Sequence, residues 1–361
     1  MIYTNFYKGK KVLVTGSTGF KGSWLCIWLK MMGAEVYGYA LKPKSEQDNF
    51  VVCGLEQQIH QYYGDIRDFQ ALQACFLEVH PDVAFHLAAQ ALVLDSYVDP
   101  HYTFETNLMG TLNFLEAVRK TSSVQAAVNI TSDKCYQNKE QIYGYREIDP
   151  MGGKDPYSAS KGCAELMAQS YIHSFFISPK EASLACARAG NVIGGGDWAK
   201  DRIIPDFFRA YIDGKKLEIR NPKAVRPWQH VLEPLNAYLL LGFKLYTDGK
   251  EYSGGWNFGP MPNEEHTVGE LVDQMIFLFG KGSYVSPKHS TELLHEAHLL
   301  KLDITKALTV LHWHPVLNFK QTVDFTLQGY LEDMNPKNIY AQRIGQIQQF
   351  MAYAGNEYEE A

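Results

Sequence analysis

The sequence predicts an α/β protein with a Rossmann-type, doubly wound parallel sheet and a smaller C-terminal α+β region. Short apolar segments alternate with helical patterns through the first half of the chain, and no hairpin signal separates them. A glycine-rich turn follows the first of these segments and opens a helix. Beyond Ala189 the alternation ends. The chain of 361 residues is long enough for one large or two moderate domains.

Six segments are predicted as strands of the sheet, because each is short, apolar and followed by glycine or polar residues. They span residues 11–15, 35–41, 59–63, 83–89, 126–130 and 182–188. The helices expected between them cover residues 23–29, 69–79, 102–120 and 157–175. Right-handed crossovers would place these helices on both faces of the sheet.

The second half of the chain predicts mixed structure. Helices are expected at 203–212, 231–246, 267–280, 304–311 and in the last 30 residues, with short strands at 217–220 and 255–259. We therefore divide the chain into a dinucleotide-binding domain, residues 1–188, to which 228–259 returns, and a substrate-binding domain, residues 189–227 and 260–335. Residues 336–361 form a C-terminal helix with an acidic tail.

Composition excludes several classes of function. A formal charge of -6 and a pI near 6.1 give no basis for nucleic-acid binding. No apolar run approaches the ~20 residues that span a bilayer, and no signal peptide is visible, so we expect a cytoplasmic protein without a membrane partner. The six cysteines and twelve histidines form no metal-ligand pattern, and no metal is expected.

A glycine motif follows the first strand, Gly16-x-x-Gly19-x-x-Gly22. Such glycines allow a tight turn and let backbone N–H groups approach a pyrophosphate at the N-terminus of a helix. An ordinary glycine-rich turn is the alternative. The residues expected to bind the dinucleotide at this turn are Gly16, Thr18, Gly19, Phe20 and Gly22.

The choice between NAD and NADP is left open by the end of the second strand. The acidic residue that would hold the adenosine ribose is missing, and Lys42 and Lys44 stand in that region. Asp65 and Ile66, after the third strand, would suit the adenine edge. Alternatively, Asp65 caps the following helix.

Tyr157 and Lys161 are predicted to form a proton-abstracting pair one helical turn apart. A phenol is a poor base at neutral pH, but a neighbouring ammonium favours its phenolate form. Ser132, at the end of a buried strand, could hydrogen-bond the same substrate hydroxyl. The pair therefore indicates a base for oxidising an alcohol.

These motifs together resemble the extended short-chain dehydrogenase/reductases, which modify nucleotide sugars with tightly held NAD(P). The resemblance rests on the glycine turn, Leu87-Ala88-Ala89, Asn107 with Gly110-Thr111, Ser132, and Tyr157-x-x-x-Lys161. It implies that Leu87, Ala88, Ala89 and Asn107 also contact the cofactor, which we expect to be NAD. Within the family, residues 18–24, 131–136, 144–147, 188–198, 226–234 and 295–303 resemble the 4,6-dehydratases that act on CDP-glucose.

That resemblance implies an NAD-dependent hydro-lyase that makes a 4-keto-6-deoxy sugar for surface polysaccharide. Asp133 would donate a proton to the leaving C6 hydroxyl, and Lys134 would act at C5, either as a base or as a cation that stabilises an enolate. A 4-epimerase of the same fold is the alternative, because it needs Tyr157 but no elimination acid. A dehydratase of another nucleotide sugar is a further alternative.

The substrate is expected to be a CDP-hexose, whose diphosphate needs cations. The residues expected to bind it are Gln90, Asn191, Arg202, Arg220, Arg226 and His298. The chain departs from the CDP-glucose pattern at Ser17, where histidine is usual, and at Leu94-Asp95, where basic residues are usual. Helices 102–120 and 157–175 resemble those that pair between subunits in this family, so we expect a homodimer or homotetramer.

Overall fold

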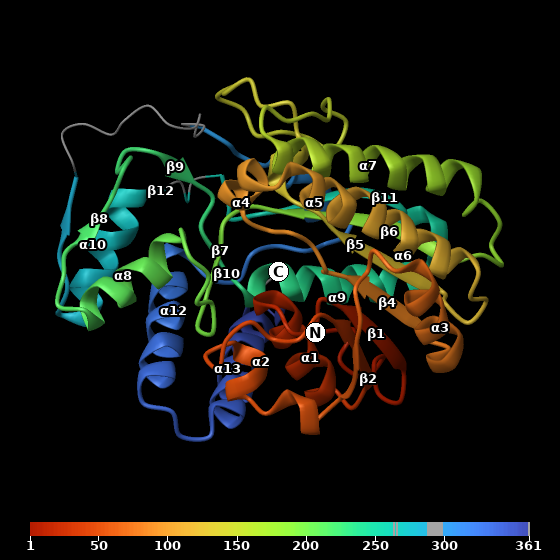
Figure 1. Ribbon diagram of the computed structural model, residues 1–361, viewed down its shortest axis with the longest axis horizontal. Helices are drawn as coiled ribbons and strands as arrows, with labels where there is room; N and C mark the ends of the chain where they lie inside the picture. The colour runs from red at the N-terminus through yellow and green to blue at the C-terminus, as the bar shows by residue number, and fades with distance from the viewer. Residues whose placement is uncertain (263, 265, 287–298, 360–361) are drawn as a thin grey trace.

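A seven-stranded parallel sheet forms the centre of the molecule, in the order β11-β6-β5-β4-β1-β2-β3 (Figure 1). The computed structural model describes residues 1–262, 264, 266–286 and 299–359. The strands are β1 (Lys11–Thr15), β2 (Glu35–Ala40), β3 (His60–Tyr63), β4 (Val83–His86), β5 (Ala126–Ile130), β6 (Ser183–Ala189) and β11 (Gly254–Phe258). The predicted fold class, a doubly wound Rossmann-type sheet, is confirmed.

The strand order places a topological switch point between β1 and β4. From β1 the chain winds outward through β2 and β3, and from β4 it winds the opposite way through β5 and β6. Thr15 pairs with His86, and His86 pairs with Asn129, so β1, β4 and β5 end at one edge of the sheet. Ligands of open α/β sheets bind outside this edge, at the switch point.

Helices cover both faces of the sheet, as Figure 1 shows. One face packs against α1 (Phe20–Met31), α2 (Asn49–Val52), α9 (Leu232–Thr247), α11 (Thr305–Thr309) and α13 (Ile339–Glu359). The other packs against α3 (Phe69–Val79), α6 (Gly110–Arg119) and α7 (Pro156–Ser174). Alternating strand side chains divide between the two cores: Val12 and Val14 enter the first, and Leu13 enters the second.

A third core lies beside the sheet and is built by later segments of the chain. Its helices are α8 (Ile203–Ile212), α10 (Val268–Phe279) and α12 (Phe319–Met334). Three two-stranded sheets flank them: β7 (Val192–Ile193) with β10 (Gln229–His230), β9 (Val225–Arg226) with β12 (His266–Thr267), and β8 (Leu217–Glu218) with β13 (Tyr284–Val285). The division of the chain into two domains remains a prediction.

The predicted helix 102–120 is three shorter pieces in the structure. These are α5 (Pro100–Phe104), a π-helical turn (Glu105–Met109) and α6, and they are preceded by α4 (Val93–Val98). A Cβ atom added at Gly110 would lie 2.5 Å from the Ile66 side chain, so α6 begins where the helix closely approaches the loop after β3. Single-turn π segments of this kind are frequent at functional sites.

Within the described residues, no helix is long and apolar enough to cross a bilayer. In the same ranges, His, Cys, Asp and Glu side chains form no group of three that could hold a metal ion.

Candidate active site

The glycine turn between β1 and α1 lies against the loop that follows β4. Gly16 has φ +73, and a Cβ atom there would lie 2.7 Å from the backbone N of Ala88. A Cβ atom at Gly22 would overlap the carbonyl oxygen of Gly16. Only glycine allows both approaches. The first turn of α1 carries no acidic residue, so its N-terminal N–H groups suit the pyrophosphate of a dinucleotide.

Two hydroxyls of this turn are engaged within the fold. Thr18 Oγ1 donates a hydrogen bond to the carbonyl oxygen of Leu41 (2.9 Å), which ties the turn to the end of β2. Ser17 is fully buried, and its Oγ donates to Gln61 Oε1 at 2.8 Å. Ser17 therefore faces the sheet at the position where the resemblance leads us to expect a histidine.

The sequence left open whether Asp65, after β3, caps the following helix, and the structure shows that it does not. Asp68, and not Asp65, caps α3, because its Oδ1 accepts a hydrogen bond from Ala71 N. Asp65 binds the Arg67 guanidinium through both carboxylate oxygens, at 2.7–3.1 Å. Burial alone would raise the pKa of Asp65, but these hydrogen bonds outweigh it and lower the pKa. Ile66 is buried and packs against α6.

Asn107 and Gln90 are joined by hydrogen bonds that hold the loop after β4. Asn107 Oδ1 accepts from Gln90 N (2.8 Å), and its Nδ2 donates to Gln90 O (3.0 Å) and Ser160 Oγ (2.9 Å). Gln90 Nε2 donates to Leu92 O and Thr103 Oγ1. These contacts fix the segment from Leu87 to Gln90 relative to α7. Contacts of Asn107 and Gln90 with cofactor and substrate remain predictions.

The loop after β5 carries three of the predicted catalytic side chains. Ser132 Oγ donates to Asp133 Oδ1 at 3.0 Å and accepts from the backbone N of Lys134 at 3.2 Å. Lys134 Nζ lies 3.6 Å from the same Asp133 oxygen. Asp133 is 2% exposed, and its Oδ2 has no hydrogen-bond partner among the described residues. A buried carboxylate oxygen without a partner is suited to a substrate hydroxyl.

Tyr157 and Lys161 lie on α7 opposite this loop, and both are buried. The Tyr157 and Ser132 side chains share a hydrogen bond. Burial raises the pKa of Tyr157 to about 12, against the effect of Ser132 and Arg202, which lower it. Burial also lowers the pKa of Lys161 to about 8, although Glu165 opposes this shift. The phenol and the ammonium therefore both lie in a buried environment on one helix, and burial is the largest influence on the pKa of each.

A buried ion pair between Arg188 and Glu165 supports the 131–136 loop. Arg188 Nε and Nη2 each lie 2.8 Å from an oxygen of Glu165, and both residues are fully buried. Glu165 also accepts a hydrogen bond from Thr131, and Arg188 Nη1 donates to Tyr136 Oη at 2.5 Å. Tyr136 in turn donates to Asn257 Oδ1. The network joins both ends of the 131–136 loop to α7, β6 and β11.

Arg202 and Lys21 extend the site toward the third core. Arg202 Nη1 lies 2.8 Å from Asp197 Oδ2, and the guanidinium is close enough to Tyr157 to lower the pKa of that phenol. Sequence reasoning assigned no role to Lys21, although it lies within the glycine turn. Burial lowers the pKa of Lys21 to about 8, with further effects from Arg202 and Asp133. A lysine between two glycines of such a turn is the signal that could have revealed it.

The other residues predicted to bind the substrate differ in burial and in their distance from the 131–136 loop. Asn191 Oδ1 is buried without a partner in the described part of the chain. Arg226 is 7% exposed and precedes Pro227. Pro227 and Asp133 Oδ2 both lie next to Gly190, so Arg226 is near the 131–136 loop. Arg220 is exposed. His298 lies outside the described residues.

Comparison with known proteins decides the family. A family model described as GDP-mannose 4,6 dehydratase matches residues 13–326. The chain belongs to this family. The CDP-glucose 4,6-dehydratase of Salmonella typhimurium strain LT2 is 50% identical over 328 residues, which cover 90% of this chain and 91% of that relative. The resemblance drawn from the sequence is thereby confirmed.

Solved structures of other nucleotide-sugar enzymes share the fold. A UDP-glucose 4-epimerase of Thermus thermophilus, in complex with NAD, is 26% identical with a TM-score of 0.74, covering 88% of this chain and 98% of that one. A dTDP-glucose 4,6-dehydratase from Bacillus anthracis strain Ames, also with NAD, is 23% identical with a TM-score of 0.73, covering 92% and 100%. A dehydratase and an epimerase thus share the fold of this chain.

Proposed function

We propose that this protein is an NAD-dependent hydro-lyase that converts CDP-glucose to CDP-4-dehydro-6-deoxyglucose and water. The observation that carries the proposal is the Ser132-Asp133-Lys134 loop, in which Ser132 and Asp133 are buried and Ser132 contacts Tyr157. An acid close to a base is what an oxidation followed by an elimination requires. The relative that is 50% identical is named a CDP-glucose 4,6-dehydratase, which supports the choice of nucleotide and sugar.

The residues present fit a dinucleotide. The turn leaves no space for a side chain at Gly16 or Gly22, next to the N-terminus of α1, where a pyrophosphate would be held. Thr18, Phe20, Asp65, Ile66 and the 87–89 segment border this edge of the sheet and are our further candidates for cofactor contacts. Bound NAD would supply a reversible hydride acceptor.

The chain's own groups would handle the protons. Tyr157, aided by the Lys161 ammonium and by Ser132, takes the proton from the C4 hydroxyl. Oxidation at C4 makes the C5 proton acidic, and we assign Lys134 to C5. It acts there either as the amine that takes this proton, or as an ammonium that stabilises the enolate while the Asp133 carboxylate takes the proton and passes it to the C6 hydroxyl. Asp133, whose Oδ2 is unpaired among the described residues, donates a proton to the departing C6 hydroxyl. The burial of Ser132, Asp133, Tyr157 and Lys161 excludes water that would otherwise compete.

Cations for the substrate diphosphate would come from Arg202 and Arg226, with Arg220 and His298 as further candidates, and Asn191 and Gln90 would contact the sugar. A CDP-hexose enzyme of this type would supply deoxysugars for lipopolysaccharide in the cytoplasm. The absence of basic side chains at Leu94 and Asp95 would leave recognition of the diphosphate to the arginines.

We also infer a homodimer or homotetramer formed through α6 and α7. Large apolar side chains on this side of the molecule are exposed, with Leu166 on α7 at 55% and Met109 before α6 at 47%. Such side chains favour association because their burial removes apolar surface from water. Light scattering at the mass of a single chain would contradict this inference.

The decisive experiment is a mass-spectrometric screen of CDP-, dTDP-, UDP- and GDP-hexoses with the purified protein and NAD. We expect CDP-glucose to give a product lighter by one water molecule. The matched control is Tyr157→Phe, which keeps the ring and removes the phenolic proton, and which should give no product. A product of unchanged mass with inverted C4 would instead identify a 4-epimerase, and loss of water from another nucleotide sugar would change the substrate.

A further inference from the structure

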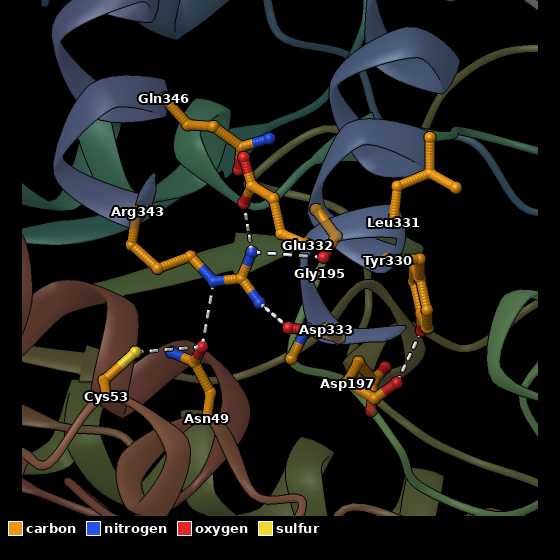
Figure 2. A network of polar contacts seen from close by, with 12 residues as sticks. Asn49, Cys53, Gly195, Asp197, Tyr330, Leu331, Glu332, Asp333, Arg343 and Gln346 are labelled. Carbon is orange, nitrogen blue, oxygen red and sulfur yellow. Dashed lines mark hydrogen bonds and ion pairs between the residues drawn. The ribbon is translucent and has the colours of Figure 1, made fainter. Parts of the chain in front are cut away.

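The C-terminal helix sends one buried arginine into the space between α1, α2 and α12. Arg343 of α13 is fully buried, and Figure 2 shows its guanidinium surrounded by polar groups. Its Nη1 donates to Glu332 Oε2 at 2.9 Å and to Gly329 O at 3.2 Å. Its Nη2 pairs with Asp333 Oδ1. The planar guanidinium thus serves two carboxylates and a carbonyl with fixed geometry, which an ammonium could not reproduce.

The same guanidinium reaches the first half of the chain. Arg343 Nε donates to Asn49 Oδ1 at 3.1 Å, and Asn49 Nδ2 donates to Ser23 Oγ at 2.9 Å (Figure 2 shows the first bond). Arg343 also lies over the Trp24 ring, 5.2 Å from its centroid. The C-terminal helix is therefore fastened to α1 and α2, the elements next to the glycine turn.

The loop that follows β7 is hydrogen-bonded to Asp333 and Trp24, two residues that contact Arg343. Asp333 Oδ2 accepts a hydrogen bond from Gly196 N at 2.7 Å, and Trp24 Nε1 donates to Gly195 O at 3.0 Å. A Cβ atom at Gly195 would lie 2.6 Å from the backbone of Gly329 and 2.8 Å from Arg343 Nη1. The two glycines therefore permit direct contact between this loop, α12 and Arg343.

The held loop leads directly to the candidate active site. Asp197 is 4% exposed, and its carbonyl oxygen accepts from Tyr330 Oη of α12 at 2.5 Å. Its Oδ2 accepts from Arg202 Nη1 at 2.8 Å. A continuous set of contacts thus runs from Arg343 through Asp333, the 195–197 loop and Asp197 to Arg202.

We propose that Arg343 is a positioning residue for the active site: through Asp333 and the 195–197 loop it sets the place of Asp197, and so directs the Arg202 guanidinium toward the substrate. This inference rests on the proposed function, because Arg202 is there assigned to the substrate diphosphate. Two-point contact with phosphate oxygens depends strongly on the direction of a guanidinium, so a small displacement of Asp197 weakens binding.

The test combines Arg343→Lys with Arg202→Ala in a double-mutant cycle. Arg343→Lys keeps the positive charge between the two carboxylates but loses the forked geometry. We expect it to raise KM for CDP-glucose roughly tenfold while kcat changes less than about twofold. In the Arg202→Ala background the same change should raise KM by less than about twofold, because both residues act on one contact.

Phe350→Leu is the matched control. Phe350 is buried on the same helix, against Trp28, and lies outside the network, so its substitution weakens packing of α13 without changing Arg343. We expect its KM to equal that of the unmodified protein. Equal KM values for Arg343→Lys and the unmodified protein, additive effects in the cycle, or the same rise in Phe350→Leu would each overturn the inference.

A second measurement separates this inference from the proposed function. If the unmodified protein does not dehydrate CDP-glucose, the proposed function fails, but the loop can still be followed by hydrogen exchange without any ligand. Arg343→Lys should then speed exchange of amides in residues 195–202 by about tenfold or more, and Phe350→Leu should not. Unchanged exchange in Arg343→Lys would contradict the inference whatever the substrate.

Discussion

Ser132 Oγ donates a 3.0 Å hydrogen bond to Oδ1 of its neighbour Asp133, and the other carboxylate oxygen of Asp133 is buried without a partner in the described chain. Ser132 also shares a hydrogen bond with Tyr157. The hydroxyl proposed to assist the oxidation at C4 thus also orients the carboxyl proposed for the elimination. One loop thus carries groups for both steps of the proposed reaction.

Asp133→Asn should block the elimination of water without preventing substrate binding. The amide is similar in size but cannot donate a carboxyl proton, so we expect formation of the 4-keto-6-deoxy product to fall roughly 100-fold or more. Binding of CDP-glucose, measured by calorimetry, should change little. Asp99→Asn is the control, because Asp99 only caps α5 and asparagine caps equally well. A fully active Asp133→Asn protein would favour the epimerase alternative.

Two substitutions of Lys134 should reveal how it acts. Its Nζ lies 3.6 Å from Asp133 Oδ1, beside the group proposed for the elimination, and we predict that it acts as a fixed positive charge that stabilises the enolate. Lys134→Arg, which cannot lose its proton, should then keep about a tenth or more of kcat, whereas Lys134→Met should lose roughly 100-fold. Steady-state rates with CDP-glucose test this. Equal inactivity of the two variants would assign Lys134 to proton removal at C5.

The buried ammonium of Lys161 should lower the free energy of unfolding of the protein. Its pKa is lowered from 10.5 to about 8 in the folded protein. Below pH 8 both folded and unfolded chains carry the proton, so the penalty for burying the ammonium is fully present, at about 3 kcal/mol. Between pH 8 and 10.5 the folded chain releases the proton first, and stability rises with pH. Above that range the penalty is gone.

Lys161→Met should therefore be more stable than the unmodified protein at pH 7 and nearly inactive. Urea unfolding of both proteins at pH 7 and pH 10 measures the difference, which should shrink at the higher pH. A stability difference that is independent of pH would show that the charge of Lys161 is not the cause.

Glu165→Gln should strongly destabilise the fold, because it leaves the Arg188 guanidinium buried without its carboxylate. We expect a loss of about 3 kcal/mol or more in unfolding free energy. Glu116→Gln, at the partly exposed pair with Arg119, is the control and should cost less than about 1 kcal/mol. Denaturant unfolding compares the two. Similar small losses would mean that the buried pair contributes little to the fold.

Local patterns were sufficient to predict the sheet and the centre of the site. β1 and β5 begin and end where the apolar runs do, and Tyr157 and Lys161 share one helix face, as their spacing requires. The helix α12 was not predicted, because Gly329 and several polar residues weaken the helical pattern. Its glycine is explained only by the close approach of Gly195, a residue distant in sequence.

The contacts around Arg343 and Lys21 could not be derived from the sequence for a related reason. Arg343 and Asn49 are separated by 294 positions, and no periodicity connects residues so far apart. Lys21 does lie in a recognisable motif, but its effect on the site depends on Arg202 and Asp133, which reach it from other elements. The spacing of side chains along the sequence describes a single helix or strand, whereas these contacts form between different elements when they pack together.

The position of β11 has a consequence for synthesis of the chain. This strand lies beside β6 at the margin of the sheet, and its partner residues in β6, such as Ala187, are made long before it. Until Gly254–Phe258 has left the ribosome, β6 presents unpaired backbone groups to other nascent chains. We therefore expect ribosome-stalled fragments that end before β11 to need chaperones, and fragments that include it to remain dispersed.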